Sequence, residues 1–211
     1  GKADDPLVQN GAVMHLGTGS PKLTEVTNSD NWNYDSYVCQ AACYRMMIAY
    51  YQGDLLTALE MTEKCKKVVD IFPGAVYIRF QAFYEGMSAL AAVHERRKIS
   101  KFSRPNLLAR GRKRLKMLQK YAKHCPENCQ HLVLMLEAEF AVLNGKLADA
   151  MSKYSEAEGL AGKAGFLDVQ ALACERSGYL VHNKSERARV LGRSIVLYKK
   201  WGAFSKADRI E

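Results

Sequence analysis

The residues best suited to bind a metal ion lie together in one short stretch, HCPENCQH at positions 124–131. Its four potential zinc ligands, two imidazoles and two thiols, are His124, Cys125, Cys129 and His131. Zinc ligands usually come as separated pairs that fold around the ion, whereas these four crowd one expected helix boundary with a proline between them. We therefore interpret the stretch as a helix boundary and keep a metal site at these four residues as the alternative.

A glycine-containing stretch near the N-terminus, LGTGSPK (16–22), lacks the Gly-x4-Gly-Lys-Ser/Thr spacing that cradles phosphate. No Ser-His-Asp, Cys-His or HExxH arrangement of catalytic residues is recognisable in the sequence either. Acidic pairs such as Glu137 and Glu139 are expected to lie on solvated helix faces. We therefore predict that this segment is not an enzyme and binds no cofactor.

The six cysteines lie mostly within helical patterns. Small secreted disulfide-rich proteins place cysteines densely in loops instead, so we expect free thiols and a reducing, cytoplasmic location. Cys39 and Cys43 lie one helical turn apart on an apolar face, and we interpret them as buried structural thiols rather than a redox pair. The most apolar run, 132–143, contains two glutamates, so we predict no membrane span.

Positive charge is concentrated in residues 96–123, which contain twelve Lys and Arg and no Asp or Glu. The chain has a formal net charge of +9, but without this segment its Lys and Arg fall from 31 to 19, against 22 Asp and Glu. The twelve cations are Arg96, Arg97, Lys98, Lys101, Arg104, Arg110, Arg112, Lys113, Arg114, Lys116, Lys120 and Lys123. Those on the helix are expected to spread over its exposed surface.

Cations at this density repel one another unless something acidic lies nearby. The segment could contact an acidic face of a protein, either a neighbouring domain or a signalling partner. It could also be a plain solvated face, or it could bind nucleic acid or anionic lipid. Aromatic residues are not interleaved with the cations as a groove for single-stranded nucleic acid would require. We therefore favour a protein partner and keep nucleic acid or anionic lipid as the alternative.

From about Asn33 onward the apolar periodicity predicts an all-α fold, preceded by an irregular N-terminal arm at residues 1–32. Breakers divide residues 33–211 into eight expected helices: 33–52, 54–70, 75–97, 105–123, 127–144, 146–162, 166–183 and 185–201. Asp54 and Ser185 are expected N-caps, and Gly165 is an expected left-handed C-cap.

Three of the expected turns share one spacing. A residue that enters the left-handed region easily is followed, five positions later, by a small residue that lets the second helix lie close to the first. The three pairs are Gly53 with Ala58, Gly145 with Ala150, and Asn183 with Ala188. Tyr154 also lies where a tetratricopeptide repeat has an aromatic residue. The pattern predicts about four helix pairs in a tetratricopeptide-like superhelix, although the second pair lacks the shared spacing.

Trp201 and Gly202 extend the apolar stripe of the last expected helix. We expect Trp201 to close the last buried face and Gly202 to end the helix. A terminal repeat has no neighbour on one side, so a large aromatic residue and a short capping segment are expected there.

The C-terminal half resembles the tetratricopeptide-like repeat region of large multidomain signalling ATPases. In that family an AAA/STAND-type ATPase, often behind a serine/threonine kinase domain, precedes the repeats, and a GAF sensor with a histidine kinase or a nucleotide cyclase often follows. The stretches that carry the resemblance are LEAEFAVLNGKLADAMSKYSEAE (136–158), AGKAGFLDVQALACERSGYL (161–180) and LYKKWGAFSKADRIE (197–211). The resemblance implies that this chain is an internal piece of a longer protein, with the catalytic motifs outside it.

The resemblance and the repeat pattern together predict a non-catalytic role. We expect a scaffold or regulatory connector that presents a surface to a protein partner and transmits domain position within a signalling ATPase or kinase. The alternative is a basic helical-repeat module that binds nucleic acid or anionic lipid through residues 96–123.

Overall fold

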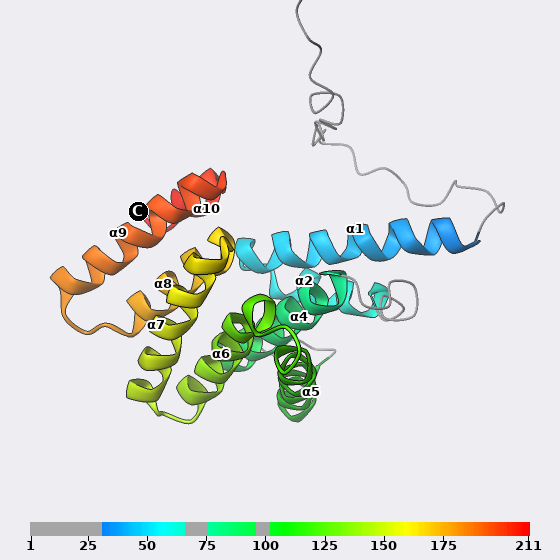
Figure 1. The fold of residues 1–211 in the computed structure, drawn as a ribbon, viewed down its shortest axis with the longest axis horizontal. Coiled ribbons are helices and arrows are strands. Elements are labelled where there is room, and N and C mark those ends of the chain that lie inside the picture. Colours follow the sequence, from blue (N-terminus) through cyan, green and yellow to red (C-terminus); the bar gives the residue numbers. More distant parts are fainter. Residues whose placement is uncertain (1–30, 66–75, 96–101) are drawn as a thin grey trace, which may run out of the picture. The chain divides into compact units, whose positions relative to one another are not determined.

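The computed structural model describes residues 31–65, 76–95 and 102–211. In these ranges the chain forms nine α-helices and no strand, which confirms the predicted all-α class (Figure 1). The helices are α1 (Asn31–Gln52), α2 (Leu55–Lys64), α4 (Val76–His94), α5 (Arg104–Ala122), α6 (Pro126–Leu143), α7 (Leu147–Ala164), α8 (Leu167–Leu180), α9 (Lys184–Trp201) and α10 (Phe204–Ala207). The predicted N-terminal arm, residues 1–32, lies outside the described residues except for Asn31 and Trp32, which are the first two residues of α1. Within the described ranges no helix has the length and apolar character needed to cross a lipid bilayer.

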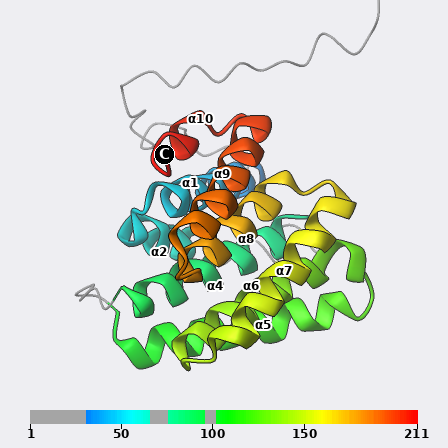
Figure 2. The ribbon, with the colours of Figure 1, turned by 90° about the vertical axis from the view of Figure 1, so that its left-hand side faces the viewer.

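Helices that follow one another in the chain pack together as hairpins. α4 packs on α5, α6 on α7 and α8 on α9, and the second helix of each pair also contacts the first helix of the next. The first helices form an inner line, since α4 contacts α6 and α6 contacts α8. Figure 2 shows the pairs following one another in sequence order, from α4 and α5 in green to α9 in orange. The predicted superhelix of helical hairpins is thereby confirmed.

Glycines in the left-handed region form the turns that the sequence predicts in two of the pairs. Gly53 and Gly145 have φ values of +75° and +73°, where any other residue would be strained. Ala58 and Ala150, five residues further along, are completely buried, so the second helix lies close to the first as predicted. Asp54 caps α2 by accepting a hydrogen bond from a backbone N–H three residues on, also as predicted.

The turn between α8 and α9 differs from the prediction. Asn183 has an extended backbone and caps α9 instead of ending α8, so the prediction of Ser185 as the N-cap was wrong. Ala188, expected to face the preceding helix, is exposed. The reason is that α8 ends three residues earlier than expected, and an extended connection changes which residues of α9 face inward. The close approach comes instead from Gly178, where a Cβ atom would lie 2.6 Å from Cδ2 of Leu191.

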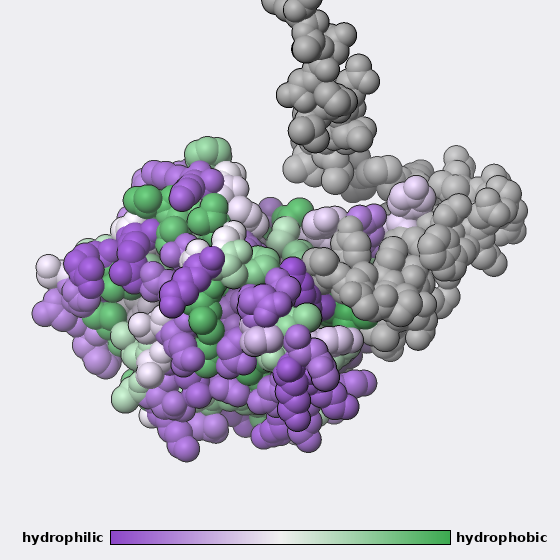
Figure 3. Space-filling model, in the orientation of Figure 1, coloured by the Kyte–Doolittle hydropathy of each residue, from purple (hydrophilic) through white to green (hydrophobic). Residues whose placement is uncertain are grey.

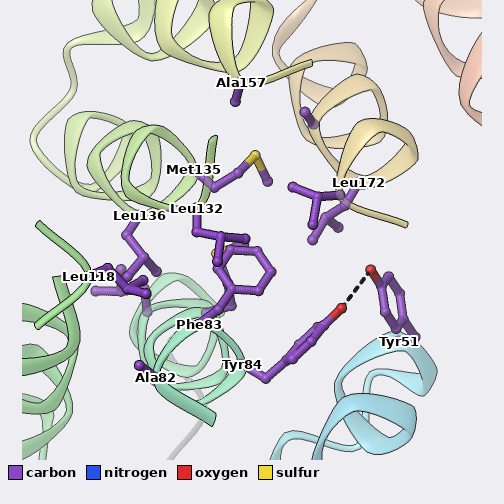
Figure 4. Close-up of a cluster of buried hydrophobic side chains, with 14 of the residues drawn as sticks. Tyr51, Ala82, Phe83, Tyr84, Leu118, Leu132, Met135, Leu136, Ala157 and Leu172 are labelled. Atoms are coloured by element: carbon purple, nitrogen blue, oxygen red, sulfur yellow. Dashed lines mark hydrogen bonds between the residues drawn. The ribbon is translucent and has the colours of Figure 1, made fainter. Parts of the chain in front are cut away.

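The inner helices α4, α6 and α8 are buried on nearly every side. Side chains from all three meet in the core, which Figure 4 shows: Phe83 and Tyr84 from α4, Leu132, Met135 and Leu136 from α6, and Leu172 from α8. The outer helices α5, α7 and α9 bury one stripe each and expose the rest. Within the described ranges, the surface of this helical array that is open to a partner therefore belongs mainly to the outer helices.

The last helix pair ends as predicted but has an additional neighbour. Gly202 ends α9 in the left-handed conformation with φ +90°, and Gly165 ends α7 with φ +80°. Trp201 packs against Tyr198 of its own helix and also against Tyr51 at the end of α1, with ring centroids 5.3 Å apart in the second contact. The sequence gives no sign of this contact, because the two residues are too distant in the chain to form a local pattern.

The C-terminal segment makes a second contact with α1. Nη1 of Arg209 donates a hydrogen bond to the backbone oxygen of Gln52 at 2.9 Å, and Nη2 donates to that of Tyr51 at 3.0 Å. The last carbonyl groups of a helix have no partner within the helix. Arg209 therefore caps the C-terminal end of α1.

Candidate interaction surface

α5 and the residue after it carry six exposed cations of the predicted basic segment: Arg104, Arg112, Lys113, Lys116, Lys120 and Lys123. None of the six forms an ion pair with another described residue. Figure 3 shows hydrophilic side chains gathered at the lower edge of the molecule, where Figure 1 places α5. The other predicted cations of the preceding loop, Arg96, Arg97, Lys98 and Lys101, lie outside the described residues.

Two arginines of α5 are held in ion pairs with neighbouring helices. Nη2 of Arg114 lies 2.7 Å from Oε2 of Glu85 on α4, and both side chains are largely buried. Nη2 of Arg110 lies 3.0 Å from Oε1 of Glu63, and its Nη1 donates to the hydroxyl of Thr62 at 2.9 Å. The expected exposed position was therefore wrong for Arg114, and Arg110 is half-buried. These two residues attach α5 to α4 and α2.

The inward position of Arg114 follows from the stripe on which it lies. Leu107, Gly111 and Leu118 are buried and recur at helical spacing, and Arg114 falls between the last two on the same face. At Gly111 a Cβ atom would lie 2.8 Å from Cδ2 of Leu90 and 3.2 Å from Cζ of Phe140, so α5 approaches its neighbours very closely there. A charge on this stripe must find a buried partner. The stripe itself was therefore the signal that could have identified Arg114.

A groove of about 700 Å³ lies where α5, α6 and the start of α7 meet. Its lining is Arg104, Leu108, Arg112 and Leu115 from α5, Glu137, Phe140, Ala141, Leu143 and Asn144 from α6 and the turn after it, and Lys146, Asp149 and Lys153 at the start of α7. The groove thus combines an apolar floor with cations on both sides. The groove could not be predicted from the sequence, because its three walls come from separate parts of the chain.

The two acidic residues of the groove already have partners. Nζ of Lys153 lies 3.1 Å from Oε2 of Glu137 and 3.7 Å from Oδ1 of Asp149. The other carboxylate oxygen of Glu137 accepts a hydrogen bond from Nε2 of Gln119 at 3.1 Å. The hydrogen bond with Glu137 raises the pKa of Lys153. Positive charge from Arg104, Arg112 and Lys146 therefore remains at the groove.

The four candidate metal ligands do not come together. His124 and Cys125 are exposed at the boundary between α5 and α6, whereas Cys129 and His131 are buried within α6. Throughout the described ranges, no group of three or more His, Cys, Asp or Glu is arranged to hold a metal ion.

His131 lies in the core, with its ring stacked on Phe166 at 4.6 Å between centroids. Neither ring nitrogen has a hydrogen-bond partner among the described residues. Burial, together with the nearby charge of Arg79, lowers the pKa of His131 to about 4. The imidazole is therefore neutral at physiological pH.

Cys39 and Cys43 are buried, as predicted, and a third thiol joins them. Sγ of Cys43 lies 3.4 Å from Sγ of Cys65 at the end of α2, and all three residues are free cysteines. The hydrogen bond shared with Cys43, and burial, raise the pKa of Cys65. Because the thiolate is the reactive form, the Cys65 thiol packs as an apolar group rather than as a reactive thiol.

The expectation that Glu137 and Glu139 lie on solvated faces was wrong for Glu139, which is only 2% exposed. Its carboxylate accepts hydrogen bonds from the Tyr154 hydroxyl on α7 and from the Arg176 guanidinium on α8. Burial, followed by the Glu139 charge, raises the pKa of Tyr154, so the hydroxyl stays protonated and donates. Tyr154, which lies where a tetratricopeptide repeat has an aromatic residue, is buried, and its hydroxyl belongs to this network.

A second buried carboxylate joins the last three helices. Glu175 of α8 accepts a hydrogen bond from the Tyr198 hydroxyl on α9 at 2.6 Å and from Nζ of Lys206 on α10 at 2.7 Å. The Tyr51 and Tyr84 hydroxyls are 3.2 Å apart (Figure 4). The Tyr84 hydroxyl also donates a hydrogen bond to the Asp168 carboxylate of α8. The first network joins α8, α9 and α10, and the second joins α1, α4 and α8.

Comparison of the chain with known protein families, with curated proteins and with solved structures gives no match in any of the three. The resemblance to the repeat region of signalling ATPases therefore rests on the sequence stretches alone and stays a prediction.

Proposed function

We propose that this chain is a non-catalytic interaction module, a scaffold or regulatory connector of helical repeats within a multidomain signalling ATPase or kinase. The observation that supports it best is the outer face of α5, where six exposed cations have no acidic partner among the described residues. A row of like charges is costly to hold together unless an opposite charge approaches it. An acidic protein surface would supply that charge.

A connector must hold its shape in order to transmit the position of a neighbouring domain. Three buried carboxylates each join two helices through an ion pair. Glu85 joins α4 to α5, Glu139 joins α6 to α8, and Glu175 joins α8 to α10. Hydrogen-bonded networks such as those at Glu139 and Glu175 favour one arrangement of the helices over others. The repeats would therefore move as one body and carry a displacement from one end to the other.

The connector role is tested by sequencing the transcript on both sides of this segment. We expect an open reading frame that continues into a phosphate-loop ATPase upstream and into a sensor or catalytic domain downstream. A stop codon shortly after Glu211 and a start codon just before Gly1 would remove the connector role and leave an isolated interaction module.

The alternative function is binding of nucleic acid or anionic lipid, and the spacing of cations along α5 supports it. Arg112, Lys116 and Lys120 recur every four residues on one exposed face, with Lys113 beside them. Each step of four residues advances about 6 Å along a helix, which is close to the spacing of phosphates along an extended strand. Such binding would weaken steeply with salt. For each phosphate contacted, a tenfold rise in salt concentration would lower the association constant roughly tenfold.

Fluorescence anisotropy with a labelled single strand and a labelled duplex, and flotation with phosphatidylserine vesicles, test this alternative. Binding that falls with salt and is lost in a Lys113→Glu, Lys116→Glu, Lys120→Glu variant would support it. Arg114 is a poor choice for this experiment, because its side chain is paired with Glu85 inside the domain.

A further inference from the structure

We infer that the groove between α5 and α7 binds an acidic peptide segment of a partner protein, with an apolar side chain of that segment on the groove floor. This site rests on the proposed protein-interaction role and adds the chemistry of the partner to it. Three properties of the groove support the assignment: its floor, its charge and the position of Arg112.

The floor of the groove is apolar and partly exposed. Leu108, Leu115, Phe140 and Leu143 are half-buried there, so part of each side chain faces the groove. A volume of about 700 Å³ falls within the range of sites that enclose a small ligand or a few side chains. Covering this floor with an apolar side chain would remove apolar surface of both molecules from water.

The charge at the groove favours a negative partner. Arg104 and Arg112 on α5 and Lys146 at the start of α7 have no ion-pair partner among the described residues, whereas both acidic residues contact Lys153. The cations lie on both sides of the floor. A segment lying in the groove would therefore meet positive charge on each side of its apolar residue.

Arg112 contributes both to the positive charge of the groove and to its contact with the apolar floor. Its guanidinium carbon lies 6.0 Å from the centroid of the Phe140 ring, over the groove floor. A guanidinium can stack on an aromatic ring and at the same time bind a carboxylate through two parallel hydrogen bonds. A ligand that carries a carboxylate next to an apolar group matches this arrangement, and acidic peptides with an aliphatic or aromatic residue have that chemistry.

Nucleic acid and membranes fit this groove less well than a peptide does. Bases need open aromatic faces on which to stack, whereas Arg112 lies over the Phe140 ring. A flat bilayer cannot enter a recess whose floor lies between two helices. The row of Lys113, Lys116 and Lys120 faces outward beside the groove and offers phosphates an easier approach.

The test is fluorescence anisotropy of the full chain with an array of labelled acidic peptides. The peptides carry Leu, Phe or Trp at varied positions among Asp and Glu, and each has a partner peptide in which Ser replaces every apolar residue. We expect the best apolar peptides to bind at least about tenfold more tightly than their Ser partners. The groove assignment would be overturned if every apolar peptide bound with the same affinity as its Ser partner, or if no peptide bound at low salt.

Two double variants with the same change in net charge locate the binding. Arg112→Glu with Lys146→Glu should weaken the apolar peptides at least about tenfold, whereas Lys113→Glu with Lys120→Glu, outside the groove, should weaken them much less. If the two variants lose equal affinity for the apolar peptides, the groove is not their binding site. The proposed contact with a protein would then lie on the outer face of α5. Tighter binding of a labelled oligonucleotide or of phosphatidylserine vesicles than of any peptide would contradict both.

Discussion

The guanidinium of Arg176 contacts both carboxylate oxygens of Glu139, with Nε 2.7 Å from Oε1 and Nη2 2.8 Å from Oε2. Tyr154 adds a third hydrogen bond to the same carboxylate, so α6, α7 and α8 meet at one buried charge. The attraction within a buried ion pair roughly offsets the cost of removing both groups from water. Removal of one partner leaves that cost uncompensated.

We expect Arg176→Met to lower the free energy of unfolding by about 3–5 kcal/mol, because Glu139 would remain buried without its cation. Urea denaturation followed by circular dichroism measures the loss. Arg189→Met is the matched control, since Arg189 pairs with Glu186 on the exposed surface of α9 and its removal should leave stability almost unchanged. A similar small effect in both variants would contradict the structural role given to Glu139.

Charge reversal on α5 should separate inward from outward cations. Arg114→Glu would place a second carboxylate against Glu85 and should destabilise the domain by about 3–5 kcal/mol. Lys116→Glu, two residues further on, changes the net charge equally but lies on the exposed face and should leave the unfolding midpoint nearly unchanged. Equal effects of the two substitutions in thermal unfolding would place Arg114 on the surface.

Acid should destabilise the domain through His131. Its pKa is about 4 in the folded state against an ordinary value of 6.5, so between these values the unfolded chain binds a proton that the folded chain does not. The stability contribution is complete above pH 6.5 and is lost as the pH falls toward 4, by a total of roughly 3 kcal/mol.

Urea titrations between pH 7 and 4 measure this loss. His131→Phe keeps an aromatic ring against Phe166 but removes the titrating group, so its stability should fall less over the same range. The comparison uses the slope with pH rather than the absolute stability, which makes it independent of how well the new ring packs. Identical slopes in the two proteins would exclude His131 as the source.

The close approach of α5 to its neighbours should make Gly111 intolerant of a side chain. Gly111→Ala would bring a Cβ atom against Leu90 and Phe140, and we expect a net loss of about 1–2 kcal/mol after the gain in helix propensity. Gly159→Ala is the control, since it lies on the exposed face of α7 with nothing within 4 Å of the new atom, and it should stabilise by up to about 1 kcal/mol. Stabilisation by both substitutions would show that α5 can move outward without cost.

Features set by neighbouring residues could be predicted from the sequence. The positive φ of Gly145 and the burial of Ala150 follow from a spacing of five residues, and the end of α9 at Gly202 follows from the same backbone preference. Hydrophobic periodicity was enough to predict the helices and their order. These features depend on interactions within one or two helical turns.

Features set by contacts between distant elements could not be predicted. Glu139 looks like a surface acid until Arg176 and Tyr154 are placed beside it, and the groove exists only when three helices are assembled. The register of α9 depends on an extended connection that no glycine marks, so Ala188 was assigned to the wrong face. The first two features depend on contacts between separate helices, and the third depends on the backbone conformation of the connection between α8 and α9.

The hydrogen bonds from Arg209 to the end of α1, with Trp201 against Tyr51, have a consequence for how this domain unfolds. In an open array each repeat contacts only its neighbours, and the ends can fray independently. Here the first and last helix pairs hold one another, so loosening of either end removes support from the other. The repeats should therefore melt in one cooperative transition, and removal of residues 204–211 should increase amide hydrogen exchange at the end of α1.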